Sequence, residues 1–562
     1  MAKNISKYLD LVVNRYISTS KFRSPLITRW TEFYKKWRNY LPPQQDIYRS
    51  NLFIPYSFQV VETIVPRLVA QSPKITVLPQ EPSDEENATV NEDVLKWQWE
   101  RVKLNEKIEL MVRSGLIYGV GFLKIGWKKD MPTIENVDIL DLFIDPDATT
   151  LDNAEFVIYR TFKTIDEIKS NLNYKNTDLV EGLVSNDQKE GLSERLSIQG
   201  LSTPTQFRDK QSKKIEILEY WEDDKLCVVA GRKVLLREET NPYSHKKKPF
   251  VYFQDYTVPN EFYGIGEIEH IEKLQEEANS LRNQIMDNTK LITNRMWKIK
   301  RSGAVNPRNV TSKPGGMILV NEKDDIDPLD VIPIPSQVVT IEQEIKSDIQ
   351  QTTGVTDYQT GTGAQGTSLN DTATGISLIQ EAGNMRFRLK MRHLEETVKR
   401  LGELMLANNQ VFIQKPFVIR LLGKQGMQFT KVRPEDLQGN YDLQPEMGAD
   451  EPMDKASQRQ QLLNMVAILS QPQFIQQVNW QEIAQMILNK FNIDNVSDIL
   501  MGAQGASGAQ DAVSQLIEQK SPQEIGTHLQ SLPSEDQQVL ASAIQDKLNQ
   551  ANSGVTNGQP AR

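Results

Sequence analysis

The closest match to a phosphate-binding loop is the stretch Gly361-Thr-Gly-Ala-Gln-Gly366-Thr367-Ser368. It has the glycines and the terminal hydroxyl of such a loop, but Thr367 occupies the position of the lysine that must reach the β- and γ-phosphates. No buried apolar strand is predicted before it. Nucleotide hydrolysis at this loop is therefore rejected.

A second glycine pattern, Tyr118-Gly119-Val120-Gly121-Phe122, resembles half of a dinucleotide-binding fingerprint. The fingerprint opens a helix, whereas the residues after this pattern predict a strand. The two glycines therefore indicate a close approach of two backbones or a tight turn, which only a residue without a side chain permits.

Metal and nucleophilic chemistry find little support in the sequence. The four histidines stand singly, and none is at metal-ligand spacing from another histidine or from the single cysteine, Cys227. They are His245, His270, His393 and His528. The turn that carries Asp145, Asp147 and Asp152 lacks the mid-loop glycine and the closing glutamate of a calcium loop, which favours solvated turn residues. The sequence predicts a protein that is not an enzyme and that has no cofactor.

Composition places the chain among globular proteins. Its 562 residues predict three or four structural regions, and one cysteine fits a chain made in a reducing cytoplasm. Residues 1–7 carry no apolar signal core, and the longest apolar stretch, Leu116 to Trp127, is interrupted by Lys124. We therefore expect a soluble protein with no secretion signal and no membrane segment.

The formal net charge of −9 is unevenly spread. Residues 1–50 hold ten Lys and Arg against three Asp and Glu, whereas residues 441–562 hold six against fourteen. The asymmetry is either ordinary solvated surface or a sign that the two ends face different partners. An acidic total argues against a tight DNA binder, which needs clustered cations, but not against a conduit that must avoid gripping DNA.

The first 260 residues mix helices and strands. An apolar face from Ile5 to Tyr16 predicts one helix, and Ser24-Pro25 would begin a second helix that ends at Pro42-Pro43. The further predicted elements are a helix over 51–70 that Pro66 bends or ends, a strand over 74–78, a helix over 94–116, a strand over 118–127, and a hairpin of 215–220 with 225–229.

Two predicted helices, each with one narrow apolar stripe, flank a small β segment. Apolar residues recur every three or four positions from Ile268 to Ile285, which predicts a helix of about thirty residues, roughly 45 Å long. Residues 296–335 switch to short strands with Pro and Gly turns, and a second stripe runs from Val338 to Ile349. Because the other faces of both helices are polar, each must belong to a bundle or to a ring wall.

The rest of the chain begins with a Thr-, Gly-, Gln- and Asn-rich loop over 353–374, and loops of that length are functional or disordered. A long helix with many cations follows from Gly375 to about Val411. Residues 441–562 contain 21 Gln, which suggests a weakly cored assembly of helices whose last ten residues are disordered.

Several runs in this order resemble the portal proteins of tailed bacteriophages. They are Arg49 to Thr63, Pro73 to Pro79, Val137 to Asp147, Phe262 to Asn279, Thr353 to Gly361 and Thr372 to Ser377. Each run is short, but their order and spacing cover residues 49 to about 410. The Gln-rich C-terminal part is similar to the family in its general character, and no particular run of residues carries the resemblance there.

The resemblance implies an α+β, mainly α-helical portal fold, built from paired stem helices, a small β clip insert, a wing and an α-helical crown. Carried over by order, the regions are a wing at 1–262, a first stem helix at 263–295, a clip at 296–336, a second stem helix at 337–352, a tunnel loop at 353–374, a long helix returning to the wing at 375–443, and a crown at 444–562.

Two groups of residues are candidates for contact with DNA. Polar side chains in the loop could touch DNA without holding it, and they are Thr360, Thr362, Gln365, Thr367 and Asn370. A basic cluster lies where the predicted stem meets the clip, and it consists of Lys290, Arg295, Lys298, Lys300 and Arg301. The cluster either contacts DNA phosphates or an acidic motor surface, or it forms salt bridges between subunits.

The resemblance also implies partners and a location. The chain would form a homo-oligomeric ring of about twelve subunits at one capsid vertex of the virion, assembled in the host cytoplasm. Double-stranded DNA would pass through the ring, and the large terminase, a head-completion adaptor, and the capsid and scaffolding proteins would contact it. A scaffold, a shell subunit or a terminase-type motor is the alternative, but a motor needs the missing phosphate-loop lysine.

Overall fold

The computed structural model describes residues 2–43, 46, 48–69, 74–181, 183, 192–200, 214–294, 296–301, 305, 307–310, 317–330, 333–335, 337–355, 373–423 and 426–446. All of them lie in the first of two compact units, which spans Met1–Ala449, and the second unit spans Asp450–Arg562. The fold is mixed α+β, about half helical, with several small antiparallel sheets. The predicted crown lies outside the described residues apart from 444–446.

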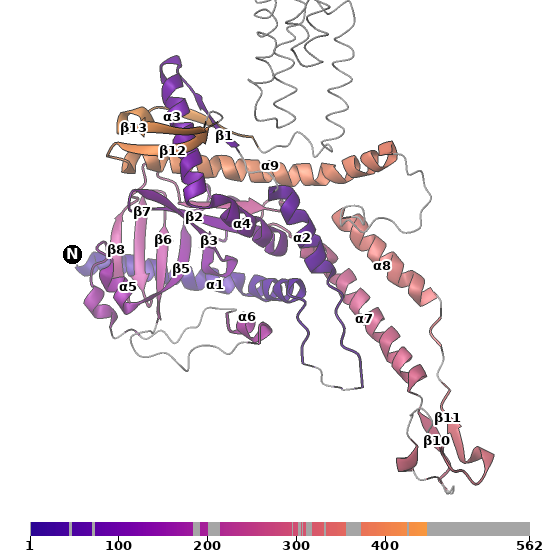
Figure 1. Ribbon diagram of the computed structural model, residues 1–562. Coiled ribbons are helices and arrows are strands. Elements are labelled where there is room, and N and C mark those ends of the chain that lie inside the picture. The colour runs from indigo at the N-terminus through magenta and orange to yellow at the C-terminus, as the bar shows by residue number, and fades with distance from the viewer. Residues whose placement is uncertain are drawn as a thin grey trace, which may run out of the picture. The chain divides into compact units, whose positions relative to one another are not determined.

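A five-stranded antiparallel sheet forms one half of the N-terminal region (Figure 1). Its strands, in sheet order, are β4 (Leu142–Ile144), β5 (Val157–Thr164), β6 (Lys214–Trp221), β7 (Lys225–Ala230) and β8 (Val234–Thr240). The predicted hairpin is confirmed, because Tyr220 of β6 pairs with Cys227 of β7. Alternate residues of these strands face opposite sides, so the sheet buries apolar side chains on both faces.

A three-stranded antiparallel sheet has the order β3-β2-β9. Its strands are β2 (Val120–Lys128), β3 (Met131–Val137) and β9 (Phe250–Gln254), and β2 confirms the predicted strand over 118–127. Helix α4 (Leu104–Tyr118) runs directly into β2. The main core gathers around this helix, because Ile108, Met111 and Leu116 are fully enclosed.

The two glycines at the α4–β2 junction have the role predicted for them. Gly119 adopts a φ of +91°, which ends α4 in the left-handed conformation that glycine tolerates best. A Cβ on Gly121 would overlap the carbonyl oxygen of Met111, and one on Gly119 would overlap that of Gly264. The pattern serves close backbone contact and not dinucleotide binding.

Helix α1 (Ala2–Trp37) is one helix of 36 residues, so the prediction of two helices is wrong. Pro25 lies inside it, although proline removes a backbone hydrogen bond and costs about 3 kcal/mol in a helix interior. The helix continues because both halves are buried. Val12 and Tyr16 pack on one face of the five-stranded sheet, whereas Trp30 and Phe33 enter the main core.

Two further boundaries differ from the predictions. Helix α2 (Tyr56–Val69) begins five residues later than expected, because residues 51–55 are extended. It also continues past Pro66, where a bend or an end was expected. The predicted helix over 94–116 is two helices, α3 (Glu85–Arg101) and α4, separated by Lys103 with a φ of +53°. The predicted strand is confirmed as β1 (Lys74–Pro79), and it pairs with β14 (Tyr441–Glu446).

The predicted helix pair is confirmed. Helix α7 (Glu267–Thr293) and helix α8 (Gln337–Thr353) lie side by side, and the antiparallel strands β10 (Trp297–Ile299) and β11 (Ile326–Pro328) lie beyond their distal ends (Figure 1). The long helix is confirmed as α9 (Ala373–Phe412), 40 residues that cross β9, β2 and α3. The strands β12 (Phe417–Gly423) and β13 (Gly426–Val432) form a hairpin after it that the sequence did not predict. Short helices α5 (Ile165–Ser170) and α6 (Leu192–Ile198) complete the set described.

Candidate functional site

Helix α7 is embedded at one end and exposed at the other. Ile268 and Ile271 are fully enclosed in the main core, and Ala278 is nearly so. Farther along the helix, the side chains of Leu291 and Ile292 are about two-fifths exposed. The apolar stripe therefore anchors the start of the helix in the main core, whereas the distal turns keep apolar surface uncovered within the described unit.

A polar stripe on α7 holds an extended segment of the N-terminal region. The backbone N–H groups of Ser50, Leu52 and Ile54 donate to side-chain oxygens of α7, at N···O distances of 2.5, 2.7 and 2.9 Å. The acceptors, in the same order, are Asp287, Asn283 and Asn279. The Gln275 side chain extends the row, since it donates to the carbonyl of Ile54 at 2.7 Å and accepts from the N–H of Ser57 at 3.1 Å.

The spacing of this row has a simple physical basis. Four residues of an α-helix advance about 6.0 Å, and two residues of an extended chain advance about 6.6 Å. An acceptor at every fourth position of α7 therefore meets every second N–H of the segment, which runs antiparallel to the helix. The sequence carried this signal, because Gln275, Asn279, Asn283 and Asp287 recur at intervals of four, but it was interpreted only as a polar face.

Ion pairs join α1 to the same helix. The Arg29 guanidinium lies 2.6 Å from Glu269, and the Lys36 ammonium lies 2.8 Å from Glu276 and also contacts Glu272. The basic excess of residues 1–50 is thus used in part within the chain, on the acidic first turns of α7.

Helix α8 packs on α7 and is capped by α9. Ile345 and Ile349 of α8 are buried, and Arg282 of α7 pairs with Glu342 of α8. At the C-terminal end of α8, Gly354 takes a φ of +74°, and the Arg386 guanidinium of α9 donates to the carbonyls of Gln351 and Thr352 at 2.8 and 2.7 Å. This cap satisfies helix-terminal carbonyls and holds the start of the predicted tunnel loop against α9.

A buried cluster of one cation and two carboxylates joins α7, α9 and the residues after β9. Lys390 of α9 pairs with Asp255 and lies 2.8 Å from Glu267 (Nζ to Oε1), and all three side chains are at most 2% exposed. The second carboxylate oxygens of Asp255 and Glu267 are buried without a hydrogen-bond partner among the described residues. No signal in the sequence joins Lys390 to the two carboxylates, which lie far from it along the chain.

The charges of this cluster require a bound proton. With both carboxylates ionised, the three groups would carry a net charge of −1 in an interior where an uncompensated charge is costly. Burial raises the pKa of the Asp255 carboxyl to about 8, although the Lys390 cation opposes this shift. The pKa of Lys390 is itself raised by the two carboxylates despite its burial. Burial therefore favours the protonated form of Asp255 beside the Lys390 cation.

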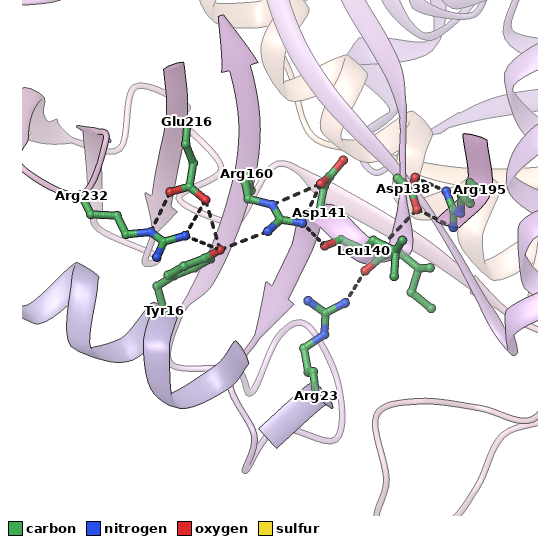
Figure 2. Close-up of polar contacts among 10 residues, drawn as sticks. Tyr16, Arg23, Asp138, Leu140, Asp141, Arg160, Arg195, Glu216 and Arg232 are labelled. Carbon is green, nitrogen blue, oxygen red and sulfur yellow. Dashed lines mark hydrogen bonds and ion pairs between the residues drawn. The ribbon is translucent and has the colours of Figure 1, made fainter. Parts of the chain in front are cut away.

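A second polar network fastens α1 to the five-stranded sheet (Figure 2). The Tyr16 hydroxyl donates to Glu216 at 3.1 Å and accepts from Arg160 at 3.1 Å. Arg232 binds the same glutamate at 2.7 Å, and Arg160 also pairs with Asp141 at 3.3 Å. Burial raises the pKa of Tyr16 to about 12, so its hydroxyl remains a donor.

Two more arginines extend this network toward the turn before β4. Arg23 of α1 donates to the carbonyl of Ile139, and Arg195 of α6 lies 2.5 Å from Asp138 (Figure 2). Arg195 also stacks over the rings of Tyr34 and Tyr118. These contacts hold α1 and α6 in place, and they give the arginines of this network a structural role.

The basic cluster predicted at the stem–clip junction is exposed where it is described. Lys290 is near the end of α7 and lies 3.8 Å from Asp287, Lys298 is in β10, and Lys300 lies 3.2 Å from Glu322. Arg301 directly follows, and Arg295 lies outside the described residues. The described members thus share one arm of the hairpin and the helix that leads into it.

The predicted tunnel loop cannot be placed in the same way. Residues 356–372 lie outside the described residues, and with them Thr360, Thr362, Gln365, Thr367 and Asn370 as well as the phosphate-loop match. His528 is also outside them. The assignment of this loop therefore stays a prediction.

The aspartates considered as cation ligands are engaged in protein contacts. Asp145 accepts backbone N–H groups from Asp147 and Glu155 at 3.2 and 3.0 Å, and Asp152 pairs with Arg400 of α9. Within the described part of the chain, no group of three or more His, Cys, Asp or Glu could hold a metal ion. No described helix is long and apolar enough to cross a lipid bilayer.

The described histidines and the cysteine have structural surroundings. His245 accepts from the N–H of Lys247 at 2.9 Å and stacks on Tyr243, and burial lowers its pKa to about 4. His270 packs against Tyr256, and the ring of His393 lies 3.2 Å from the carbonyl of Gln254. Burial raises the pKa of the Cys227 thiol to about 12, so it is not a reactive thiolate.

In this arrangement a mixed α/β region anchors two long helices that carry a small β hairpin, as the resemblance to portal proteins implies. The family model described as "Phage SU10 portal protein" matches residues 128–539, and the chain belongs to that family. Membership confirms the resemblance found in the sequence. It implies a structural protein that forms a ring in a phage capsid, and not an enzyme.

Proposed function

We propose that this chain is one subunit of a ring, with about twelve copies, that occupies one vertex of the capsid. Double-stranded DNA passes through the ring during packaging and ejection. The protein catalyses nothing, and its role is to form the channel and a platform on which other proteins dock. Its location in the virion follows from that role.

The observation that carries the proposal is the uncovered apolar surface of the helix pair. Leu291 and Ile292 near the end of α7 and Val339 and Ile341 near the start of α8 are about 39–54% exposed, whereas apolar residues of both helices nearer the wing are buried. Exposed apolar patches of this kind mark interaction surfaces. In a closed ring, neighbouring copies supply the missing cover through one repeated head-to-tail interface.

The regions are proposed with the bounds predicted from the sequence. The wing is 1–262, the stem helices are 263–295 and 337–352, the clip is 296–336, and the crown is 444–562. The course of α7, β10, β11 and α8 supports the stem and the clip. We assign the segment 353–374 to the tunnel loop, and the contact of Arg386 with the end of α8 holds the start of this segment against α9.

Contacts with DNA are proposed to be polar and independent of sequence. Each subunit carries nine excess negative charges, so the ring as a whole repels the phosphates and lets DNA slide. The candidates for direct contact are Thr360, Thr362, Gln365, Thr367 and Asn370. The large terminase would dock on the clip during filling, and a head-completion adaptor would replace it, while the capsid and scaffolding proteins would contact the wing.

The test is the mass and image of the purified protein, by native mass spectrometry with negative-stain electron microscopy. Rings of about a dozen subunits with a central hole are the expected result. A compact small oligomer without a hole would contradict the proposal. Protein that stays monomeric is tested again with the scaffolding protein, and failure to form rings there also contradicts it.

A further inference from the structure

Charge is separated between the two arms of the clip hairpin to an unusual degree. Residues 288–321 contain seven Lys and Arg and no Asp or Glu, whereas residues 322–330 contain five Asp and Glu and one Lys. The first arm includes β10 and the second includes β11. The first arm of the hairpin is therefore basic and the second arm is acidic.

Among the described residues of the hairpin, only part of this charge is neutralised. Lys300 pairs with Glu322, and the Asp325 carboxylate is buried and accepts the N–H of Glu322 at 3.0 Å. Other charged side chains are exposed and form no ion pair with another described residue, namely Lys298, Arg301, Asp324, Asp327 and Asp330.

Exposed apolar side chains surround the same hairpin. Met317 and Leu319 are each 91% exposed, and Met296 and Trp297 are 51% and 39% exposed. Solvent exposure of that much apolar surface is unfavourable, so the hairpin resembles one half of an interface with an apolar centre and a charged rim.

We propose that the basic β10 arm of one subunit binds the acidic β11 arm of the next subunit around the ring. The inference rests on the proposed ring and names the contact that the clip makes in it. A head-to-tail interface requires two different, complementary surfaces on every copy, and opposite charge on the two arms meets that requirement. A two-fold contact that pairs each arm with its own copy would instead place like charges together.

DNA is the other occupant that the basic arm could have, and the geometry disfavours it. Lys298 lies directly opposite Asp327 in the register of the two strands, and Lys300 is bound to Glu322. Lys298 and Lys300 thus each have a carboxylate beside them, which repels phosphate. Tight binding of DNA depends on cations that neutralise phosphates, which an adjacent acidic strand opposes.

The test uses charge reversal on each arm separately and on both. One variant carries Lys298→Glu with Arg301→Glu, and another carries Asp324→Lys with Asp327→Lys. At low salt, each variant alone should need about a tenfold or higher protein concentration to form rings, because like charges meet at every interface. Added salt should reduce the difference, since it screens exposed charges.

Mixing then identifies the partner. The two variants together should form rings again, and native mass spectrometry should show the two masses in equal numbers. A protein with all four substitutions should form rings by itself and should mix with the unchanged protein below the random proportion. A matched control, Lys128→Glu with Lys129→Glu in the β2–β3 turn, should assemble normally.

Three results would overturn the inference while leaving the ring intact. They are normal assembly of both single-arm variants at low salt, random mixing of the fourfold variant with the unchanged protein, and loss of DNA retention alone in the basic-arm variant. Absence of rings from the unchanged protein would count against the proposed function itself, and therefore against this contact as well.

Discussion

Lys390, in the middle of α9, lies 2.8 Å from Glu267 in the first turn of α7 (Nζ to Oε1), and both side chains are almost completely buried. One residue thus connects the longest described helix to the start of the proposed stem. Since Asp255 contacts the same ammonium, the end of β9 is held at this point too. The junction between wing and stem is therefore a charged cluster inside an apolar core.

Replacing the cation of this cluster should strongly destabilise the fold. Lys390→Met would leave Asp255 and Glu267 buried without a counter-ion, and removal of one partner from a buried ion pair costs about 3–5 kcal/mol. Urea denaturation would measure the loss. Lys399→Met, an exposed position on the same helix, is the control and should change stability by about 0.5 kcal/mol or less. Equal effects of the two substitutions would contradict the role given to Lys390.

The same cluster should make stability depend on pH. Burial raises the pKa of Asp255 to about 8, above the value of about 3.9 in an unfolded chain. The folded state therefore binds this proton more tightly than the unfolded chain does. The stability that proton binding adds is fully present below about pH 4 and is lost as the pH rises toward 8. Asp255→Asn, which is neutral at every pH, should become more stable relative to the unchanged protein as the pH increases.

Free energies of unfolding at pH 5, 6.5 and 8 would measure that trend. Asp147→Asn, at an exposed turn, is the matched control and should show no such trend. A difference between Asp255→Asn and the unchanged protein that stays constant over this range would show that Asp255 does not hold the proton.

Removing two acceptors from the polar stripe of α7 should release the extended segment of residues 50–54. Asn279→Ala with Asn283→Ala removes the acceptors of the Ile54 and Leu52 N–H groups. A hydrogen bond contributes about 1 kcal/mol net, so each amide should exchange its hydrogen roughly five- to tenfold faster. Hydrogen exchange followed by mass spectrometry would measure this. Gln284→Ala, which is exposed on α7, should leave the exchange unchanged, and protection that persists in the double variant would refute the pairing.

A methyl group at Gly121 should disturb the junction of α4 and β2. The added Cβ would overlap the carbonyl of Met111, and overpacking of this kind costs about 1–3 kcal/mol. Gly200→Ala is a useful comparison, because nothing lies within 4 Å of its Cβ and only its φ of +71° opposes the change. Thermal unfolding should show a larger loss for Gly121→Ala, and the reverse order would contradict the steric argument.

Several helices and strands could be predicted from the sequence, because the pattern that indicates each one lies within neighbouring residues. The apolar stripe of α7, the switch to short strands after it and the second stripe of α8 each depend on the periodicity of neighbouring residues. Gly119 and Gly121 were likewise recognised as sites of close approach. Separately, short runs of residues between Arg49 and Ser377, taken in order, carry the resemblance to portal proteins that the family match over residues 128–539 confirms.

Other features were decided only by tertiary packing. Pro25 predicted a break, but burial of Tyr16 on one side and Trp30 on the other keeps α1 continuous. The sequence predicts a helix from Asn51, yet the N–H groups of Leu52 and Ile54 find acceptors on α7 and the chain stays extended there. Asp255, Glu267 and Lys390 meet only because three distant elements cross. Periodicity reports which face of an element is apolar, whereas the partner of each polar group depends on contacts between residues far apart in the chain.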